Sequence, residues 1–356
     1  LADNLKQLTQ RAVFLLEELI RIPSFSREES ETADLIYQYL EKCGLEPIRE
    51  GNNVWVLSDQ FDESKPTILL NSHHDTVKPV QGWTRDPYSV GSDPKCLFGL
   101  GSNDAGASLV SLIHTFLFLN QDSNRSYNLI MAASAEEEIS GKNGIASILP
   151  SLGNIALGIV GEPTLLEMAV AEKGLMVLDC YAKGISGHAA REEGENAIYK
   201  AMQDIAWFQS YQFDKSSDLL GAVKMSVTQV GAGTQHNVVP DSCHFVVDVR
   251  TNELYSNQEV YELVQSHVSS EVKPRSFRLN SSGIAFTNPV VQKGISMGLG
   301  YYGSPTLSDQ ALMSFPTLKI GPGDSARSHT ANEYILIEEI EKGIKTYIEM
   351  LSGLEI

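Results

Sequence analysis

Acidic and histidine side chains stand at the ends of three apolar segments of this sequence. The three ends read Asn71-Ser72-His73-His74-Asp75 after 67–70, Glu136-Glu137-Glu138 after 129–133, and Gly161-Glu162 after 155–160. Histidine nitrogen and carboxylate oxygen are the ligands from which zinc sites are built when cysteine is absent. The three ends therefore predict a metal site, provided that the fold brings them together.

His73 and Asp75 are two residues apart at the first of these ends. Because successive side chains of a strand alternate between its faces, these two point the same way and His74 points the other way. One ring nitrogen of His73 can then hold an ion while the nearby carboxylate fixes the orientation of the ring. A polar turn at a strand end explains so short a motif equally well, and the rest of the chain has to decide between the two.

Three consecutive acids, Glu136 to Glu138, repel one another unless a cation neutralises them or a proton is shared. A glutamate that stays unligated beside a metal-bound water is suited to general-base work. The alternative is a solvated helix start, where acids favour the positive end of the helix dipole. Both interpretations stay open on position alone.

Asp104 closes the stretch Gly99-Leu100-Gly101-Ser102-Asn103-Asp104, which reads as a turn leading into a helix. Two zinc ions ~3.5–4 Å apart need a carboxylate that bridges them, and Asp104 is a candidate for that role. The stretch could be mistaken for a dinucleotide-binding loop. However, that loop requires glycine at position 104, and an acid there would repel a pyrophosphate.

A second histidine would complete a two-ion site, and the chain has seven besides His73. Five are discounted: His74 faces away, His114 lies in an apolar helix, His244 lies on a strand, and His236 and His267 fall in the later α+β segment. Two candidates remain. His329 follows the last apolar strand in a glycine-containing loop, and His188 stands in a Ser-Gly-His motif.

The elements that must position these residues alternate between strand and helix up to residue 173. Periodicity and caps predict helices at 4–22, 26–44, 105–119, 289–299 and 337–351, the second of them with Ser26 and Glu29 as a capping box. Strands are predicted at 67–70, 129–133, 155–160 and 317–320. A hairpin is expected at 51–53 and a loop over 76–95. This order is typical of a layered α/β domain with a mixed, largely parallel sheet, in which functional groups gather beyond the carboxyl ends of the strands.

The pattern changes near Gly174, where strands of alternating polarity begin. Strands are expected at 177–181, 223–230 and 244–250, and helices at about 195–212 and 257–269. The simplest division makes 1–173 and 284–356 the domain that carries the metal site, and 174–283 an inserted α+β domain.

The bulk properties exclude several classes of function. A formal net charge of −18 argues against nucleic acid and anionic membranes as partners. No apolar run approaches the length of a membrane span, and the first residues show no basic segment followed by an apolar core. The four cysteines are scattered without a CxxC pair, so a reducing cytoplasm is the expected location. No Gly-x-Ser-x-Gly elbow of a serine hydrolase appears.

Over essentially the whole chain, these motifs resemble the zinc-dependent aminoacylases and carboxypeptidases, in the branch of acetylornithine deacetylase and succinyl-diaminopimelate desuccinylase. The resemblance implies a co-catalytic pair of zinc ions per subunit, with cobalt as a substitute, and an inserted lid and dimerisation domain. It implies five metal ligands, of which Asp104 bridges the ions: His73, Asp104, Glu138, Glu162 and His329. Asp75 then orients His73, and Glu137 is the general base.

The resemblance also assigns three residues of the inserted domain. His188 would reach the partner subunit's site and stabilise the developing oxyanion, and Asn237 and Arg250 would hold the substrate, Arg250 through a carboxylate, which its planar guanidinium suits. This sequence departs from the family pattern in that Ser72 replaces a glycine and an acidic segment follows His188. The three glutamates also leave a shift by one residue open, with Glu136 as base and Glu137 as ligand.

The implied reaction is hydrolysis of the amide of an N-acyl-L-amino acid, such as acetylornithine or acetylcitrulline in arginine biosynthesis. Glu137 would take the proton of the attacking water and return it to the leaving amine. An N-succinyl amino acid is the alternative, because Lys173, Arg191 and Arg327 could each meet a second carboxylate, and a dipeptide is a further one. A homodimer through the inserted domain is expected. A metal-binding protein without catalysis is disfavoured, because a structural zinc site is closed and needs no spare base.

Overall fold

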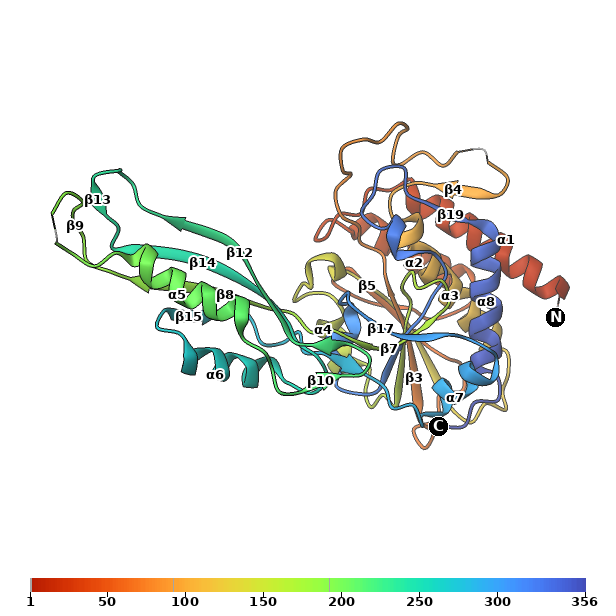
Figure 1. The fold of residues 1–356 in the computed structure, drawn as a ribbon. Helices are drawn as coiled ribbons and strands as arrows, with labels where there is room; N and C mark the ends of the chain where they lie inside the picture. The colour runs from red at the N-terminus through yellow and green to blue at the C-terminus, as the bar shows by residue number, and fades with distance from the viewer. Residues whose placement is uncertain (1, 92, 192) are drawn as a thin grey trace. The chain divides into compact units, whose positions relative to one another are not determined.

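The computed structural model describes residues 2–91, 93–191 and 193–356 (Figure 1). These residues divide into two compact units. Unit 1 comprises Leu1–Val170, Gly283–Tyr302 and Ser308–Ile356, and unit 2 comprises Ala171–Ser282 and Gly303–Leu307. The sequence-based division, with 174–283 inserted, did not anticipate that a short segment at 303–307 belongs to unit 2.

A mixed sheet forms the centre of unit 1. Its middle four strands are parallel, in the order β5 (Asn128–Ser134), β3 (Thr67–His73), β6 (Leu157–Val160) and β18 (Thr317–Lys319). Antiparallel pairing joins β2 (Asn53–Leu57) to β5, β1 (Ile48–Glu50) to β2, and β7 (Met168–Glu172) to β18. Beyond these, β16 (Ser282–Gly283) and β17 (Tyr301–Ser304) both pair with β7. Every residue of β3 and β5 is buried, as expected of parallel strands covered on both faces. The mixed, largely parallel sheet and the hairpin at 51–53 are thus confirmed.

Helices cover both faces of this sheet. They are α1 (Ala2–Ile20), α2 (Ser30–Lys42), α3 (Ala107–Leu119), α4 (Ile145–Ile148), α7 (Pro289–Ser296) and α8 (Ile337–Leu351). The helices α1, α3 and α8 pack together on one side, and α4 lies on the other (Figure 1). Outside the sheet, β4 (Cys96–Phe98) pairs with β19 (Tyr334–Leu336). The layered α/β prediction is confirmed, with helix boundaries shifted by a few residues.

The predicted capping box of the second helix is wrong. The helix α2 begins at Ser30, and its N-cap residue Glu29 makes no capping side-chain bond. The Ser26 hydroxyl instead donates to Asp75 at 2.7 Å, and the Glu29 carboxylate accepts the backbone N–H of Arg27 at 2.6 Å. A short-range capping pattern was therefore overruled by a long-range contact to the strand end at Asp75.

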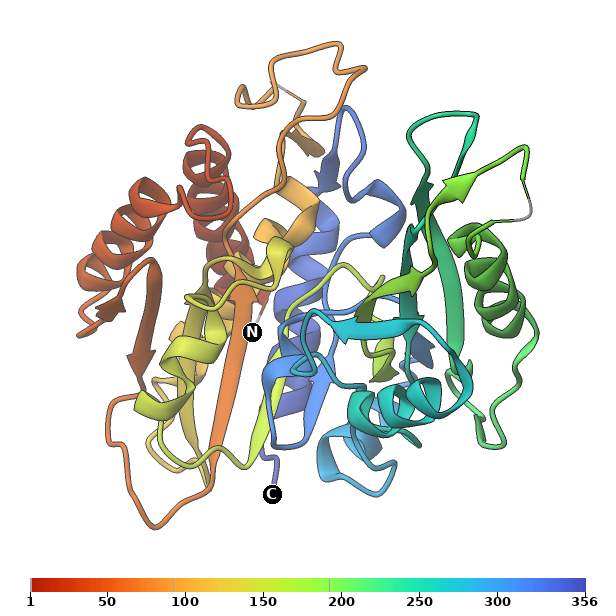
Figure 2. The ribbon, with the colours of Figure 1, turned by 90° about the vertical axis from the view of Figure 1, so that its left-hand side faces the viewer.

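Unit 2 is an antiparallel sheet covered by two helices (Figure 2). The strand order is β12 (Lys224–Ala232), β14 (Ser242–Arg250), β8 (Met176–Lys183) and β15 (Glu271–Pro274), and the helices are α5 (Ala197–Ser210) and α6 (Asn257–His267). Minor pairs are β9 (Gly187–His188) with β13 (Val238–Val239), and β10 (Ser216–Ser217) with β11 (Gly221–Ala222). Phe245, Val247 and Val249 face the core with the helices, as predicted. Within the described ranges, no helix combines the length and apolarity that crossing a membrane requires.

Candidate metal centre

Side chains from separate segments of unit 1 meet beyond the carboxyl ends of β3, β5 and β6. His73 is the last residue of β3, Glu137 follows β5, and Glu162 follows β6. The Nε2 atom of His73 lies 3.3 Å from Asp104 Oδ1, 3.8 Å from Glu162 Oε1 and 3.9 Å from Glu137 Oε2. The carboxyl ends of neighbouring parallel strands share one edge of a sheet, which explains why residues so distant in sequence converge.

Two groups of three ligand atoms are each compact enough to hold an ion. They are His73–Asp104–Glu138 and His73–Glu137–Glu162, in which the ligand atoms lie within 4.8 Å of one another. His329 extends the first group, since its Nε2 lies 2.8 Å from Glu138 Oε2 and 3.6 Å from Asp104 Oδ2. Asp104 therefore turns one oxygen toward each histidine, as a bridging carboxylate would. This donor set of imidazoles and carboxylates suits zinc and related divalent ions.

The site concentrates negative charge that the protein alone does not neutralise. Burial and the neighbouring carboxylates raise the pKa of Glu137 well above its usual range and that of Glu162 to about 8. The pKa of Glu138 is also raised, mainly by burial. Burial opposes charging of His73, but its hydrogen bonds with Asp104 and Asp75 raise its pKa well above the usual value. Clustered carboxylates of this kind are relieved by a divalent cation, so the residues present fit a metal site.

Asp75 supports both sides of the centre. The Nδ1 atom of His73 lies 2.9 Å from the Asp75 carbonyl oxygen and 3.4 Å from its carboxylate, which leaves Nε2 facing Asp104. The same carboxylate accepts the backbone N–H groups of Glu137 at 3.0 Å and Glu138 at 3.2 Å. One buried acid thus orients the imidazole of His73 and the turn that carries the two glutamates.

The three glutamates point in different directions. Glu136 turns away from the centre, and its carboxylate accepts the side-chain amide of Asn143 at 2.9 Å and its backbone N–H at 3.3 Å. Glu137 and Glu138 face the centre with side chains only 12% and 7% exposed, so the solvated helix start is wrong. Because Glu136 faces Asn143, the geometry argues against the alternative with Glu136 as base and Glu137 as ligand.

His74 lies outside the ligand set, as expected from strand alternation. Its Nδ1 contacts the Thr32 hydroxyl at 2.9 Å and its Nε2 contacts the Asn52 carbonyl oxygen at 2.8 Å. Burial lowers its pKa, so the ring is held neutral in a structural role.

Two buried acids near the centre were missed by sequence reasoning. Asp309 accepts the side-chain amide of Asn71 at 3.0 Å and the Ser134 hydroxyl at 2.6 Å, and thereby joins the ends of β3 and β5. Glu333 accepts backbone N–H groups of the turn that contains Asp104. Neither acid belongs to a repeated or strand-end motif. The one available signal was the position of Glu333, four residues after His329 and directly before an apolar strand.

The three predicted residues of unit 2 do not form one cluster. The Ala189 N–H donates to the Asn237 carbonyl oxygen at 3.0 Å, and β9 pairs with β13, so His188 and Asn237 lie close together. Arg250 is the last residue of β14, and Ser242, which follows β13 closely in the chain, is its first. At ~3.3 Å per residue these two ends of the strand are roughly 26 Å apart. Its guanidinium holds Asp248 through bonds of 2.8 and 3.0 Å.

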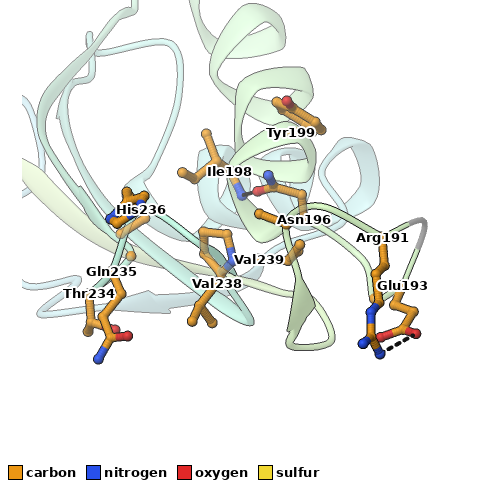
Figure 3. A pocket seen from close by; sticks show the side chains of 15 residues that line it. Arg191, Glu193, Asn196, Ile198, Tyr199, Thr234, Gln235, His236, Val238 and Val239 are labelled. Atoms are coloured by element: carbon orange, nitrogen blue, oxygen red, sulfur yellow. Dashed lines mark hydrogen bonds and ion pairs between the residues drawn. The ribbon is translucent and has the colours of Figure 1, made fainter.

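A pocket of about 850 Å³ lies beside β9 and β13 in unit 2 (Figure 3). Its lining includes Arg191, Asn196, Tyr199 and His236. The ion pair between Arg191 and Glu193 stands at one side of it, at 3.6 Å. Arg191 and Glu193 therefore lie at a solvent-facing surface of this unit.

The chain resembles known proteins over most of its length. Residues 69–353 match the family model described as Peptidase family M20/M25/M40. Succinyl-diaminopimelate desuccinylases of two Cereibacter sphaeroides strains are 26% identical over 261 residues, which cover 68% of this chain and 68% of theirs.

Two solved structures share the fold. Aminopeptidase PepT from Bacillus cereus has a TM-score of 0.75 and 18% identity, covering 96% of this chain and 98% of that one. The YXEP protein of Bacillus subtilis, described as a dinuclear metal-binding peptidase of the M20 family, has a TM-score of 0.74 and 21% identity, covering 98% of each chain.

Proposed function

This chain belongs to peptidase family M20/M25/M40 and is a metal-dependent hydrolase of amide bonds, and we propose that its substrates are N-acyl amino acids. The observation that carries the proposal is the cluster of carboxylates around His73 and His329, with Asp104 between the two histidines. We propose zinc for both ions, with His73, Glu162, Glu138 and His329 as terminal ligands and Asp104 as the bridge. Four unpaired cysteines support a reducing compartment such as the cytoplasm.

The chemistry follows from the placement of Glu137. Bound ions would supply Lewis acidity and lower the pKa of a water molecule in the centre. Glu137 takes a proton from the attacking water, whose oxygen bonds to the acyl carbon, and delivers it to the nitrogen as the C–N bond breaks. Its carboxylate faces the centre, with Oε2 3.9 Å from His73 Nε2, a position from which it can carry the proton between the two steps. Asp75 keeps Glu137 in place through the backbone N–H.

An N-acetyl and an N-succinyl substrate are equally well supported. The sequence motifs resemble acetylornithine deacetylase, whereas the curated relatives are named as succinyl-diaminopimelate desuccinylases. Arg327, offered above for a second carboxylate, is occupied by Glu339 through bonds of 2.7 and 3.1 Å. In unit 2, burial and the charges of Lys224 and Arg250 lower the pKa of Lys173, which the sequence analysis named as another candidate for a second carboxylate.

A substrate panel tests this proposal. We expect the zinc-loaded protein to hydrolyse N-acetyl or N-succinyl forms of ornithine and citrulline faster than the dipeptide Ala-Ala, with the freed amine as the readout. Preference for one acyl series identifies the acyl group. Cleavage of Ala-Ala alone would indicate a dipeptidase. No hydrolysis of any substrate in the panel, with metal confirmed as bound, would overturn the proposal.

We also propose a homodimer through unit 2. The strand β12 is the outer strand of its sheet in the described chain and carries the exposed Val230, and the adjacent α5 exposes Tyr199 and Met202. An outer strand with apolar neighbours is a ready surface for pairing with a second copy about a two-fold axis. In such a dimer His188 would act in the site of the other subunit, as the resemblance implies.

Light scattering after size exclusion checks the dimer. We expect a mass of twice 39.0 kDa for the native chain and a monomer for the double variant Met202→Glu, Val230→Glu. Phe14→Glu on α1 is the matched control, because it introduces the same charge at an exposed apolar residue of unit 1. A native monomer at micromolar concentration, or a double variant that stays dimeric, would contradict the proposed interface.

A further inference from the structure

Glu333 is a buried residue whose carboxylate hydrogen-bonds to the backbone of the turn that contains Asp104. Its Oε1 accepts the N–H groups of Asn103 at 2.8 Å and Asp104 at 2.9 Å, and its Oε2 accepts that of Gly101 at 3.1 Å. Its own carbonyl oxygen accepts the Gly99 N–H at 3.0 Å. The side chain of Glu333 therefore accepts three backbone N–H groups of this turn, those of Gly101, Asn103 and Asp104, and holds them in one orientation.

Asn103 forms a second tie between the same two segments. Its side-chain amide donates to the Asp324 carbonyl oxygen at 3.1 Å and to the Ser328 hydroxyl at 3.3 Å, and it accepts the Asp324 N–H at 3.0 Å. Ser328 directly precedes His329. The turn that ends in Asp104 and the loop that carries His329 are thus joined on both sides of the histidine, by Asn103 before it and by Glu333 after it.

We propose that Glu333 is a positioning residue that sets the distance between Asp104 and His329, and thereby the affinity for the ion that these two ligands share with Glu138. The inference rests on the proposed two-ion site. The other ion would share Asp104 as a ligand, but its remaining ligands, His73 and Glu162, are fixed by the ends of β3 and β6, away from the loop that carries His329. Loss of the Glu333 contacts therefore weakens one ion more than the other.

The substitution Glu333→Gln isolates this role. A carboxylate only accepts hydrogen bonds, whereas a glutamine amide turns an NH₂ donor toward at least one of the three N–H groups. The turn must then shift to separate the two donors. Supporting residues of this kind typically contribute about 10–100-fold to metal affinity, and we expect a loss of that size for one ion.

Titration of the metal-free protein with Co²⁺, followed by calorimetry and visible absorbance, tests the proposal. The native chain should bind two ions. In Glu333→Gln one binding step should weaken about 10–100-fold while the other stays nearly unchanged. Asn103→Ala removes the second set of contacts between the two segments and should weaken the same binding step. It keeps the test decisive if Glu333→Gln fails to fold.

Asp204→Asn in unit 2 is the matched control, because Asp204 is also a buried acid that accepts two backbone N–H groups, those of Ser269 and Ser270. It should lower the urea midpoint and leave both binding steps intact. Unchanged Co²⁺ binding in Glu333→Gln, or equal weakening of both steps, would overturn the positioning role. A native chain that binds no pair of ions would instead overturn the proposed two-ion function.

Discussion

Replacement of Glu137 by glutamine should lower kcat by about 10²–10⁴-fold while both metal ions stay bound. Glutamine keeps the size of the side chain and cannot take a proton from water. The backbone N–H of residue 137 still donates to Asp75, so the turn and the neighbouring ligand Glu138 keep their positions. Steady-state kinetics together with metal analysis of the purified variant measure both parts of the expectation.

Glu136→Gln provides the control for this experiment. Glu136 is adjacent in sequence and also buried, but its carboxylate points to Asn143 rather than to the metal centre. Its glutamine variant should retain activity close to that of the native chain. A Glu137→Gln enzyme with native kcat, or the large loss appearing in Glu136→Gln instead, would show that the base is misassigned within the three glutamates.

Stripping the divalent ions with a chelator should abolish hydrolysis, and added zinc or cobalt should restore it. Without the ions, no group in the described centre lowers the pKa of the attacking water. The largely buried side chains of Asp104, Glu138 and Glu162 are then left close together without a cation between them. Activity before chelation, after chelation and after reloading is the direct measurement, and hydrolysis that persists in a verified metal-free sample would contradict the metal-dependent mechanism.

The stripped protein should also lose stability as the pH rises. The pKa of Glu162 is raised from 4.5 in the unfolded chain to about 8 in the folded one, and that of His329 from 6.5 to about 9, the latter by its hydrogen bond to Glu138. Between these limits the folded chain binds more protons than the unfolded chain. The free energy of unfolding therefore falls from about pH 4.5 to about pH 9.

Urea midpoints of stripped and reloaded protein across this pH range measure the effect. In the reloaded protein the ions take the place of these protons, and metal binding strengthens as the ligands lose protons. The fall in the free energy of unfolding with rising pH should therefore disappear. A stripped protein whose midpoint rises with pH over this range would contradict the charge pattern deduced for the centre.

Part of the cluster of acids and histidine could be predicted from sequence because these residues follow strand ends. The apolar runs before His73, Glu137 and Glu162 mark parallel strands, and the geometry of a parallel sheet gathers their carboxyl ends. Asp104 and His329 lie in irregular loops; the sequence made Asp104 a candidate bridge and left His329 and His188 open as the second histidine, and the resemblance to a known family assigned the ligand role to His329. The direction in which each of the three glutamates points depends on the backbone of Glu136, a left-handed turn with φ of 53° that no propensity indicates.

The supporting residues could not be predicted for a different reason. Ser26, Asp309 and Glu333 act through partners 49 to 238 residues away, several of them backbone amides that have no signature in the sequence. Arg327 was judged free to meet substrate because its partner Glu339 lies on the helix that follows, 12 residues on. Local patterns indicate which segments form strands and helices, whereas these contacts exist only once the segments are packed.

The insertion of unit 2 between β6 and β18 has a consequence for how the centre is assembled during synthesis. Glu162 and His329 are separated by 167 residues (329 − 162), so at about 5–20 residues per second the ribosome needs roughly 8–33 s to make the last proposed ligand after the others. During that interval the nascent chain lacks His329 and α8, and it lacks β18 until near the end. Capture of the proposed pair of ions would therefore be a late event, which requires that the first and last segments of unit 1 have packed together.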